Sequence, residues 1–168
     1  MANKKDYKMN IIKQFKILSL KEKKQIENKL KELFGIKSIY GTLLQKSEEK
    51  IFLFQGSLTI PELQRLERLI PIERAGVYFA KLQKGEIRLS IEGTQILKDQ
   101  ITKNIFELDE KQTEIWMMGE ELDIQTGMKG FIIIKYKEHF LGCGKASFEK
   151  ISNFIPKNRR LKNRNIIK

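Results

Sequence analysis

The stretch that decides the fold runs from residue 131 to residue 160 and reads FIIIKYKEHFLGCGKASFEKISNFIPKNRR. It opens with an apolar run, Phe131 to Tyr136, that is typical of a buried strand. Ile151 to Ile155 is expected to form a last strand, which Pro156 ends. Short strands separated by glycines, with one helix before them, favour a small β-barrel of about 60 residues.

Two glycines, Gly142 and Gly144, interrupt this stretch in the run Gly142-Cys143-Gly144-Lys145. A phosphate-binding loop needs glycines between a strand and a helix, and that context is absent here. We interpret the two glycines as a structural turn, at a bulge or bend where the backbone passes close to a neighbour. Lys145 leaves this bend and is a candidate contact for RNA.

The residues before this stretch complete the second unit. Asn104 to Leu108 reads as a strand, and Asp109 with Gln112 forms a capping box for a helix that ends at Gly119. Trp116 lies near the end of this helix. We interpret it as a core residue rather than a stacking platform for a base.

The first part of the chain alternates between helical and strand patterns. Ser19-Leu20-Lys21-Glu22 is a capping box for a helix that Gly35 ends, and Thr59-Ile60-Pro61-Glu62 is a second box for a helix that Pro71 ends. Two hairpins are expected, from residues 39–44 with 51–54 and from residues 77–82 with 86–91, followed by a short helix at 93–97.

These elements predict an α+β fold in two units. An α+β domain covers residues 12–100, a barrel covers residues 101–160, and a basic tail covers residues 161–168. The barrel is near the lower size limit for an independent core, so we expect it to pack against the first unit.

The 168-residue chain has a formal net charge of +12, and both of its ends are basic. Residues 1–31 hold 10 Lys against 3 acidic residues, and residues 157–168 hold 6 basic and no acidic residues. Basic segments on a near-neutral body favour a polyanionic partner, foremost nucleic acid. A membrane surface, or a generally lysine-rich composition without such a partner, stays open as an alternative.

Several classes of function are disfavoured. Cys143 and His139 are the only residues of their kinds, so neither a disulfide nor a four-ligand metal site is expected. No Ser-His-Asp or Cys-His arrangement is credible, and we expect a protein that is not an enzyme and has no cofactor. No apolar run approaches the length of a membrane span and no signal peptide is apparent, so we expect a cytoplasmic protein.

The basic tail combines arginine and amide side chains. Arginine can bridge two phosphate oxygens or stack on a base. A solvated, disordered tail is the alternative. The candidate RNA-binding residues are Lys145, Asn153, Lys157, Arg159, Arg160, Lys162 and Arg164.

Two runs, Leu141 to Lys145 and Asn153 to Arg160, resemble the PUA-type RNA-binding domain that closes RsmF and related Sun-family RNA cytosine-5 methyltransferases. In that family a Leu-Gly-x-Gly-Lys turn precedes an Asn-x-aromatic-Pro-Lys-x-x-Arg segment. Here the aromatic residue is shifted by one place, to Phe154. The resemblance implies a PUA domain without the methyltransferase body, because no glycine-rich loop for S-adenosylmethionine is apparent.

A second resemblance covers nearly the whole chain. The order of Ala75 to Lys81, Glu86 to Ser90, Met118-Gly119-Glu120 and Leu141 to Gly144 is similar to that in small ribosome-biogenesis factors of archaea and eukaryotes. Those factors join a pre-PUA α/β domain to a C-terminal PUA barrel. The resemblance implies RNA binding through Lys145, Lys157, Arg159 and Arg160, and it favours an archaeal source.

The leading hypothesis is a non-catalytic protein that binds structured RNA, either rRNA or tRNA, in ribosome biogenesis. It would present RNA to a separate RNA cytosine-5 methyltransferase or to ribosome-assembly proteins. A protein-interaction adaptor is the rival, and its mark would be an exposed apolar patch around Tyr40, Phe52 and Phe54. An accessory subunit that completes the active site of a partner enzyme is a third hypothesis.

Overall fold

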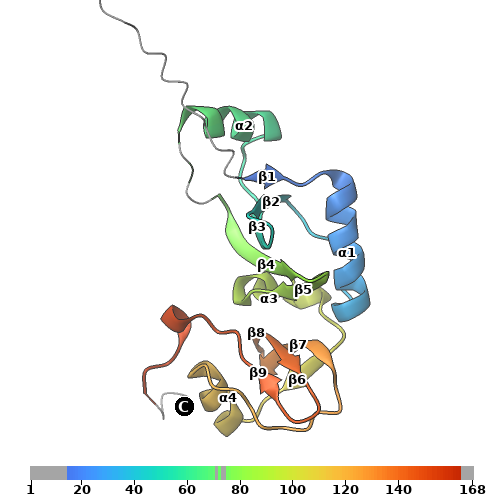
Figure 1. Cartoon of the computed structure of the whole chain (residues 1–168), viewed down its shortest axis with the longest axis vertical. Coiled ribbons are helices and arrows are strands. Elements are labelled where there is room, and N and C mark those ends of the chain that lie inside the picture. Colours follow the sequence, from blue (N-terminus) through green and yellow to red (C-terminus); the bar gives the residue numbers. More distant parts are fainter. Residues whose placement is uncertain (1–14, 71, 73–74, 164–168) are drawn as a thin grey trace, which may run out of the picture.

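The chain folds as an α+β protein with two sheets, one in each half. The computed structural model describes residues 15–70, 72 and 75–163 (Figure 1). The elements of the first half are β1 (Lys16–Ile17), α1 (Leu20–Phe34), β2 (Thr42–Lys46), β3 (Lys50–Phe54), α2 (Ile60–Leu69), β4 (Val77–Gln83), β5 (Glu86–Leu89) and α3 (Ile91–Ile96). The second half holds β6 (Ile105–Glu107), α4 (Glu110–Met117), β7 (Gly130–Tyr136), β8 (His139–Ala146) and β9 (Ile151–Ser152), with short 3-10 helices η1 (Lys98–Gln100) and η2 (Lys157–Arg159).

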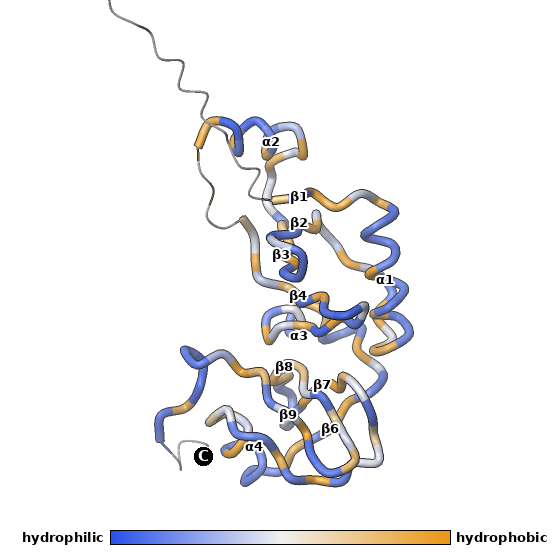
Figure 2. The backbone as a smooth tube through the Cα atoms, viewed as in Figure 1, coloured by the Kyte–Doolittle hydropathy of each residue, from blue (hydrophilic) through white to orange (hydrophobic). Residues whose placement is uncertain are grey.

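Helix α1 begins and ends where its local sequence predicts. The Glu22 amide donates to the Ser19 hydroxyl at 3.3 Å, and the Ser19 amide donates to the Glu22 carboxylate at 2.8 Å. Gly35 ends the helix with φ +80°, which confirms its predicted role. Hydrophobic positions recur between hydrophilic ones along the helix (Figure 2), as expected of a helix with one buried face.

The first sheet is antiparallel throughout, in the order β1-β2-β3-β4-β5. Both predicted hairpins are confirmed, and Lys84 and Gly85 close the second with positive φ at both positions. The strand expected at Ile39 begins only at Thr42. The Ile39 amide instead donates to the Glu27 carboxylate of α1 at 2.9 Å, which draws this residue away from the sheet.

The two faces of this sheet have different neighbours. The face that carries Leu53, Phe79 and Ile87 packs against α1. On the opposite face Phe15, Leu44 and Phe52 form a smaller cluster. Because side chains alternate along a strand, Arg88, between Ile87 and Leu89, also projects from this second face.

The second sheet is a curled half-barrel in the order β6-β7-β8-β9, with β6 parallel to β7. An isolated bridge from Leu122 to Ile151 extends it by one position. The capping box of Asp109 and Gln112 begins α4 as predicted, and Trp116 is fully buried, which confirms its interpretation as core. Strand β9 ends at Ser152 rather than Ile155, because the Asn153 side chain turns the chain by accepting from the Ile155 amide.

Gly142 and Gly144 lie inside strand β8 rather than in a turn between strands, and the expected bulge or bend falls at Gly142. What interrupts the strand is a bulge: Cys143 pairs with Ile133 and Phe140 with Lys135, so two residues of β8 face one residue of β7. Gly142 lies in this bulge with φ +90°. At Gly144 an added Cβ would lie 3.0 Å from the Trp116 ring, so close packing requires a glycine there.

One hydrophobic core joins the two halves. Phe131, Ile133, Phe140 and Cys143 from the second sheet belong to the same buried cluster as α1 and the first sheet. The amide of Thr102 also donates to the Phe34 carbonyl at 2.9 Å. A second core forms around Trp116. In the described part of the chain no helix is long and apolar enough to cross a membrane.

Candidate nucleic-acid interface

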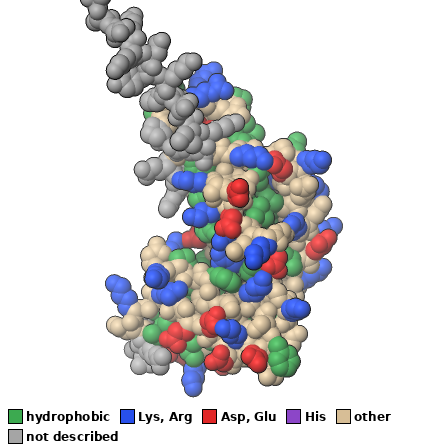
Figure 3. Space-filling model, in the orientation of Figure 1, with side chains coloured by type: hydrophobic (Ala, Val, Ile, Leu, Met, Phe, Trp, Pro, Cys, Tyr) green, Lys and Arg blue, Asp and Glu red, His purple; other side chains and the backbone are tan. Residues whose placement is uncertain are grey.

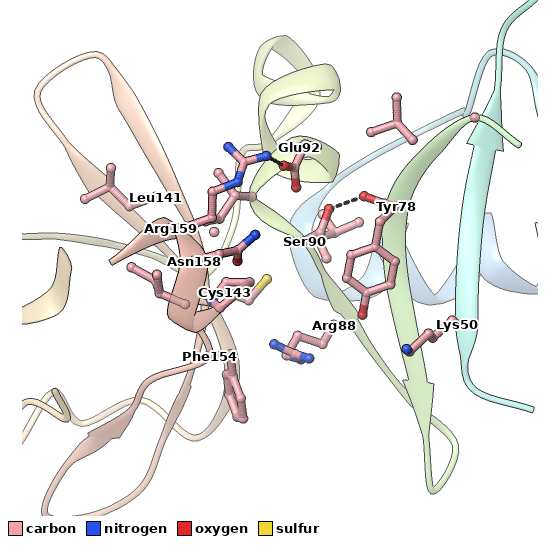
Figure 4. Close-up of a pocket in the computed structure, with 17 residues that line it drawn as sticks. Lys50, Tyr78, Arg88, Ser90, Glu92, Leu141, Cys143, Phe154, Asn158 and Arg159 are labelled. Atoms are coloured by element: carbon pink, nitrogen blue, oxygen red, sulfur yellow. Dashed lines mark hydrogen bonds and ion pairs between the residues drawn. The ribbon is translucent and has the colours of Figure 1, made fainter. Parts of the chain in front are cut away.

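A cleft lies between the two halves, and its walls come from both. It has a volume of about 530 Å³. Strands β4 and β5 and the start of α3 form one wall, and β8 with the segment after β9 forms the other (Figure 4). Its lining residues are Lys50, Gly76, Val77, Tyr78, Arg88, Leu89, Ser90, Ile91, Glu92, Leu141, Gly142, Cys143, Phe154, Ile155, Pro156, Asn158 and Arg159.

The sheet wall of the cleft carries a row of cations. Lys50 pairs across strands with Lys81, and Lys81 pairs with Arg88. Like charges directly opposite one another are unfavourable, and only Lys81 is compensated, by Glu49 at 2.9 Å. Within the described residues neither Lys50 nor Arg88 has a carboxylate partner. A bound anion would relieve this repulsion.

Arg88 is held by an aromatic ring rather than by a carboxylate. Its guanidinium carbon lies 4.3 Å from the centroid of the Phe154 ring. Phe154 in turn contacts Phe131, with ring centroids 6.0 Å apart, and the Lys145 ammonium lies 5.0 Å from the Phe131 centroid. Two contacting rings thus lie between the cations Arg88 and Lys145.

Tyr78 and Cys143 line the cleft without acid–base or nucleophilic character. Burial raises the pKa of Tyr78 above its ordinary value, so its hydroxyl stays protonated and can donate. Burial also raises the pKa of the Cys143 thiol to about 12, so a thiolate is negligible at neutral pH. The arrangement suits binding of an anion with a planar group.

Two predicted RNA-binding residues form ion pairs that bridge the halves, and both side chains stay exposed. The Lys145 ammonium pairs with the Glu86 carboxylate of β5 at 2.7 Å. The Arg159 guanidinium pairs with the Glu92 carboxylate of α3, a contact that Figure 4 draws at the rim of the cleft. Arg159 thus lines the cleft and Lys145 lies outside it, each paired with one carboxylate of the first half.

The start of the tail is fixed against the second half. Arg160 donates from Nε to the Ile155 carbonyl at 3.0 Å and lies against Gly119, where an added Cβ would approach Nε to 2.2 Å. The Leu161 amide donates to the Met117 carbonyl at 2.9 Å. Lys157 and Lys162 are exposed, and Arg164 lies outside the described residues.

Asn153 was predicted to contact RNA, but its side chain has a structural role. Its Nδ2 donates to the Trp116 carbonyl at 2.8 Å and the Glu120 carbonyl at 2.9 Å. Its Oδ1 accepts from the Ile155 amide at 2.7 Å. Both amide hydrogens are used inside the protein, which leaves little capacity for reading a base.

A wider groove continues from Lys145 on the outer side of the second sheet. It holds about 1000 Å³, and its lining includes Lys129, Lys150 and Phe148, whose side chain is 80% exposed. Lys150 pairs with Glu121. Figure 3 shows Lys and Arg side chains on both halves of the visible face, so the basic surface is not confined to the ends of the chain.

Sequence reasoning missed the residues that form the sheet wall and its aromatic support, namely Lys50, Tyr78, Arg88 and Phe154. The alternation of Arg88 with two apolar neighbours predicts only that it leaves the buried face of a strand. Its position over Phe154 depends on how two segments 66 residues apart in sequence come together. Phe154, the aromatic residue in the run from Asn153 to Arg160, was the one feature of the sequence that pointed to this part of the site.

Comparison with known proteins shows that the second half is similar to a described family of domains. The sequence model described as "Methyltransferase RsmF PUA domain" matches residues 103–161. These residues form a PUA-like domain that resembles the C-terminal part of RsmF, which confirms the first predicted resemblance.

Similarity to whole proteins reaches beyond that domain. Proteins named ribosomal RNA small subunit methyltransferase F are 28% identical over 145 residues in Aeromonas salmonicida (strain A449) and 24% identical over 143 residues in Vibrio vulnificus (strain YJ016). Each alignment covers 85% of this chain and 29% of the relative, so it includes much of the first half. The chain spans less than a third of the length of these relatives. They are bacterial, which does not support the expected archaeal source.

Proposed function

We propose that this chain is a non-catalytic RNA-binding protein that binds ribosomal RNA in the cleft between its two halves. The proposal rests on Lys50 and Arg88, two cations of the cleft wall that have no carboxylate partner among the described residues, and on the contact of Arg88 with Phe154. Cations bind phosphates, and rings and guanidinium planes stack on bases. The RsmF-like PUA domain and the charge of +12 support this choice of partner.

In this proposal the two halves act as a pre-PUA-like domain, residues 12–100, and a PUA-type domain, residues 101–160. Lys145, Lys157, Arg159 and Arg160 extend the contact surface from the cleft toward the tail at residues 161–168. The relatives are named for small-subunit ribosomal RNA, so that RNA is the first ligand to test. This function belongs in the cytoplasm, where bacterial ribosomes assemble.

Titration with small-subunit ribosomal RNA at several salt concentrations tests the proposal. Each phosphate contact that is lost should lower the slope of log affinity against log salt by about one. We expect this decrease for Lys50→Ala in the cleft and for Lys157→Ala beside it, with weaker binding at every salt concentration. The measurement is fluorescence anisotropy of labelled RNA.

The control is Lys21→Ala, which removes an equal charge from an exposed position on α1. This variant should keep the slope of the unaltered protein. Equal losses in the control and in both other variants would mean that the net charge, and not the cleft, binds RNA. An affinity that does not change with salt would contradict the proposal altogether.

A second candidate function is docking of a partner protein, such as an RNA cytosine-5 methyltransferase or a ribosome-assembly protein. The apolar patch expected for it does not form around Tyr40, Phe52 and Phe54, because Phe52 is buried and Phe54 half-buried. Other apolar side chains are exposed on and beside α2. They are Leu58, Ile60, Leu69 and Ile70, here called the α2 patch, and Leu69 is 71% exposed.

Affinity purification from the native cells tests this second candidate. Leu69→Asp should abolish recovery of a partner enzyme or assembly protein while RNA recovery is unchanged. Thr59 and Glu62 still cap α2 in this variant, so the helix is expected to form. Recovery of the same proteins with both forms would exclude the α2 patch as a docking surface.

A further inference from the structure

We propose that the cleft takes an unpaired nucleotide of a single RNA strand, with its base stacked on the guanidinium of Arg88. This inference rests on the proposed RNA-binding function and adds to it the form of RNA that the cleft accepts.

The first argument is the layered support of Arg88. Phe154 lies under the guanidinium at 4.3 Å, and Phe131 packs against Phe154 at an interplanar angle of 59°. In Figure 4 Arg88 lies between Phe154 on one side and Tyr78 and Lys50 on the other. Phe154 thus covers one face of the Arg88 guanidinium, and the opposite face of the guanidinium is directed toward the cleft. A guanidinium held in this way is a platform on which a base can stack.

The second argument is the placement of polar groups around that platform. Lys50 is exposed and lies on the same wall as Arg88, where its ammonium can bind the phosphate of the same nucleotide. Tyr78 is half-buried beside both, and its protonated hydroxyl can donate to a base edge. On the opposite wall Asn158 offers an amide that can donate and accept.

The third argument is access. In an A-form duplex the faces of the bases are covered by their neighbours, so no base face can reach a platform inside a cleft. The cleft volume of about 530 Å³ falls within the range of roughly 300 to 1,000 Å³ that is typical of sites for small ligands. A nucleotide that is unstacked and unpaired fits this description, whereas a helix does not.

The test compares one short unstructured RNA oligonucleotide with the duplex formed from it and its complement. The full chain binds each in fluorescence anisotropy titrations at the same salt concentration. We expect the single strand to bind roughly tenfold more tightly than the duplex, since stacking of one base contributes about that much.

Arg88→Lys separates stacking from charge, because lysine keeps the cation and lacks the planar group. We expect this variant to lose roughly tenfold in affinity for the single strand and to keep its affinity for the duplex. Arg65→Lys, at an exposed position on α2, is the matched control and should leave both affinities unchanged.

A second reagent tests the same point without altering the protein. A ribose-phosphate oligomer of equal length that lacks bases should bind like the duplex and more weakly than the intact strand. Equal binding of the intact and the base-free strand, or of single strand and duplex with no effect of Arg88→Lys, overturns this inference and leaves RNA binding in place. Failure to bind any of these RNAs overturns the proposed function itself.

Discussion

Asn153 holds three backbone positions with one side chain, on Trp116, Glu120 and Ile155. It thereby ends β9 and directs the chain toward η2. A sequence motif with an asparagine before an aromatic residue and a proline does not reveal whether the amide faces RNA or the protein. The hydrogen bonds in the folded structure show that the Asn153 amide faces the protein.

Replacement of Asn153 by Ala should therefore affect folding rather than binding. It removes two hydrogen bonds to the Trp116 and Glu120 carbonyls and the one accepted from the Ile155 amide, which we expect to cost about 1 to 3 kcal/mol of unfolding free energy. Urea denaturation measures this cost, and RNA affinity of the folded variant should be unchanged.

The matched control is Asn158→Ala, since Asn158 is an exposed amide of the same type in the cleft wall. Its stability should stay within about 0.5 kcal/mol of the original protein. If Asn153→Ala were as stable as the control and bound RNA more weakly, its assignment as a structural residue would be wrong.

Gly144 shows how packing restricts a single position. A Cβ there would lie 2.5 Å from Ile151 Cγ2 and 3.0 Å from the buried Trp116 ring. We expect Gly144→Ala to cost about 1 to 3 kcal/mol through overpacking, with a shift in Trp116 fluorescence. An unchanged melting temperature and emission spectrum would show that β8 moves away at little cost.

At the scale of elements, the helix α1 depends on a capping box that is sensitive to acid. The Lys16 ammonium and then the Ser19 amide and hydroxyl lower the pKa of Glu22 from 4.5 to about 2. A carboxyl group whose pKa is lower in the folded state stabilises the fold above its unfolded pKa, and this contribution is lost as pH falls.

We expect the stability that Glu22 contributes to be complete above about pH 5 and to disappear between pH 4.5 and 2. Glu22→Gln should therefore show a smaller decrease in unfolding free energy across this window than the original protein. Urea denaturation followed by circular dichroism at several pH values measures the difference. Glu32→Gln on the same helix is the control, and a matching change there would contradict the assignment.

Local elements were predictable because their determinants are local. The capping boxes at Ser19 and Asp109 and the left-handed Gly35 each lie within a few residues of what they fix. Strand β1 and the parallel pairing of β6 with β7 were not predicted. Each depends on a partner strand distant in sequence, as does the cleft itself.

At the scale of the whole molecule, the two halves share one hydrophobic core across the predicted boundary at residue 100. Cys143 and Phe131 of the second sheet pack in the same cluster as Phe34 and Leu53 of the first half. Separation of the halves would expose this surface to water. We therefore expect them to fold together, although each has its own sheet.

Urea unfolding observed with two probes tests this expectation. Trp116 is the only tryptophan and reports on the second half, whereas far-ultraviolet circular dichroism reports on both halves. The two curves should coincide in a single transition. Two separated transitions would show that residues 101–160 form an independent domain and that the shared core contributes little.

The two ion pairs between the halves, Glu86 with Lys145 and Glu92 with Arg159, have a consequence for protein engineering. A chimera that carries only the PUA-like half would bring both cations and leave both carboxylates behind. Such a graft would gain two free positive charges and would adhere to any polyanion. If the chain binds RNA as proposed, its selectivity would depend on both halves and could not be transferred with one of them.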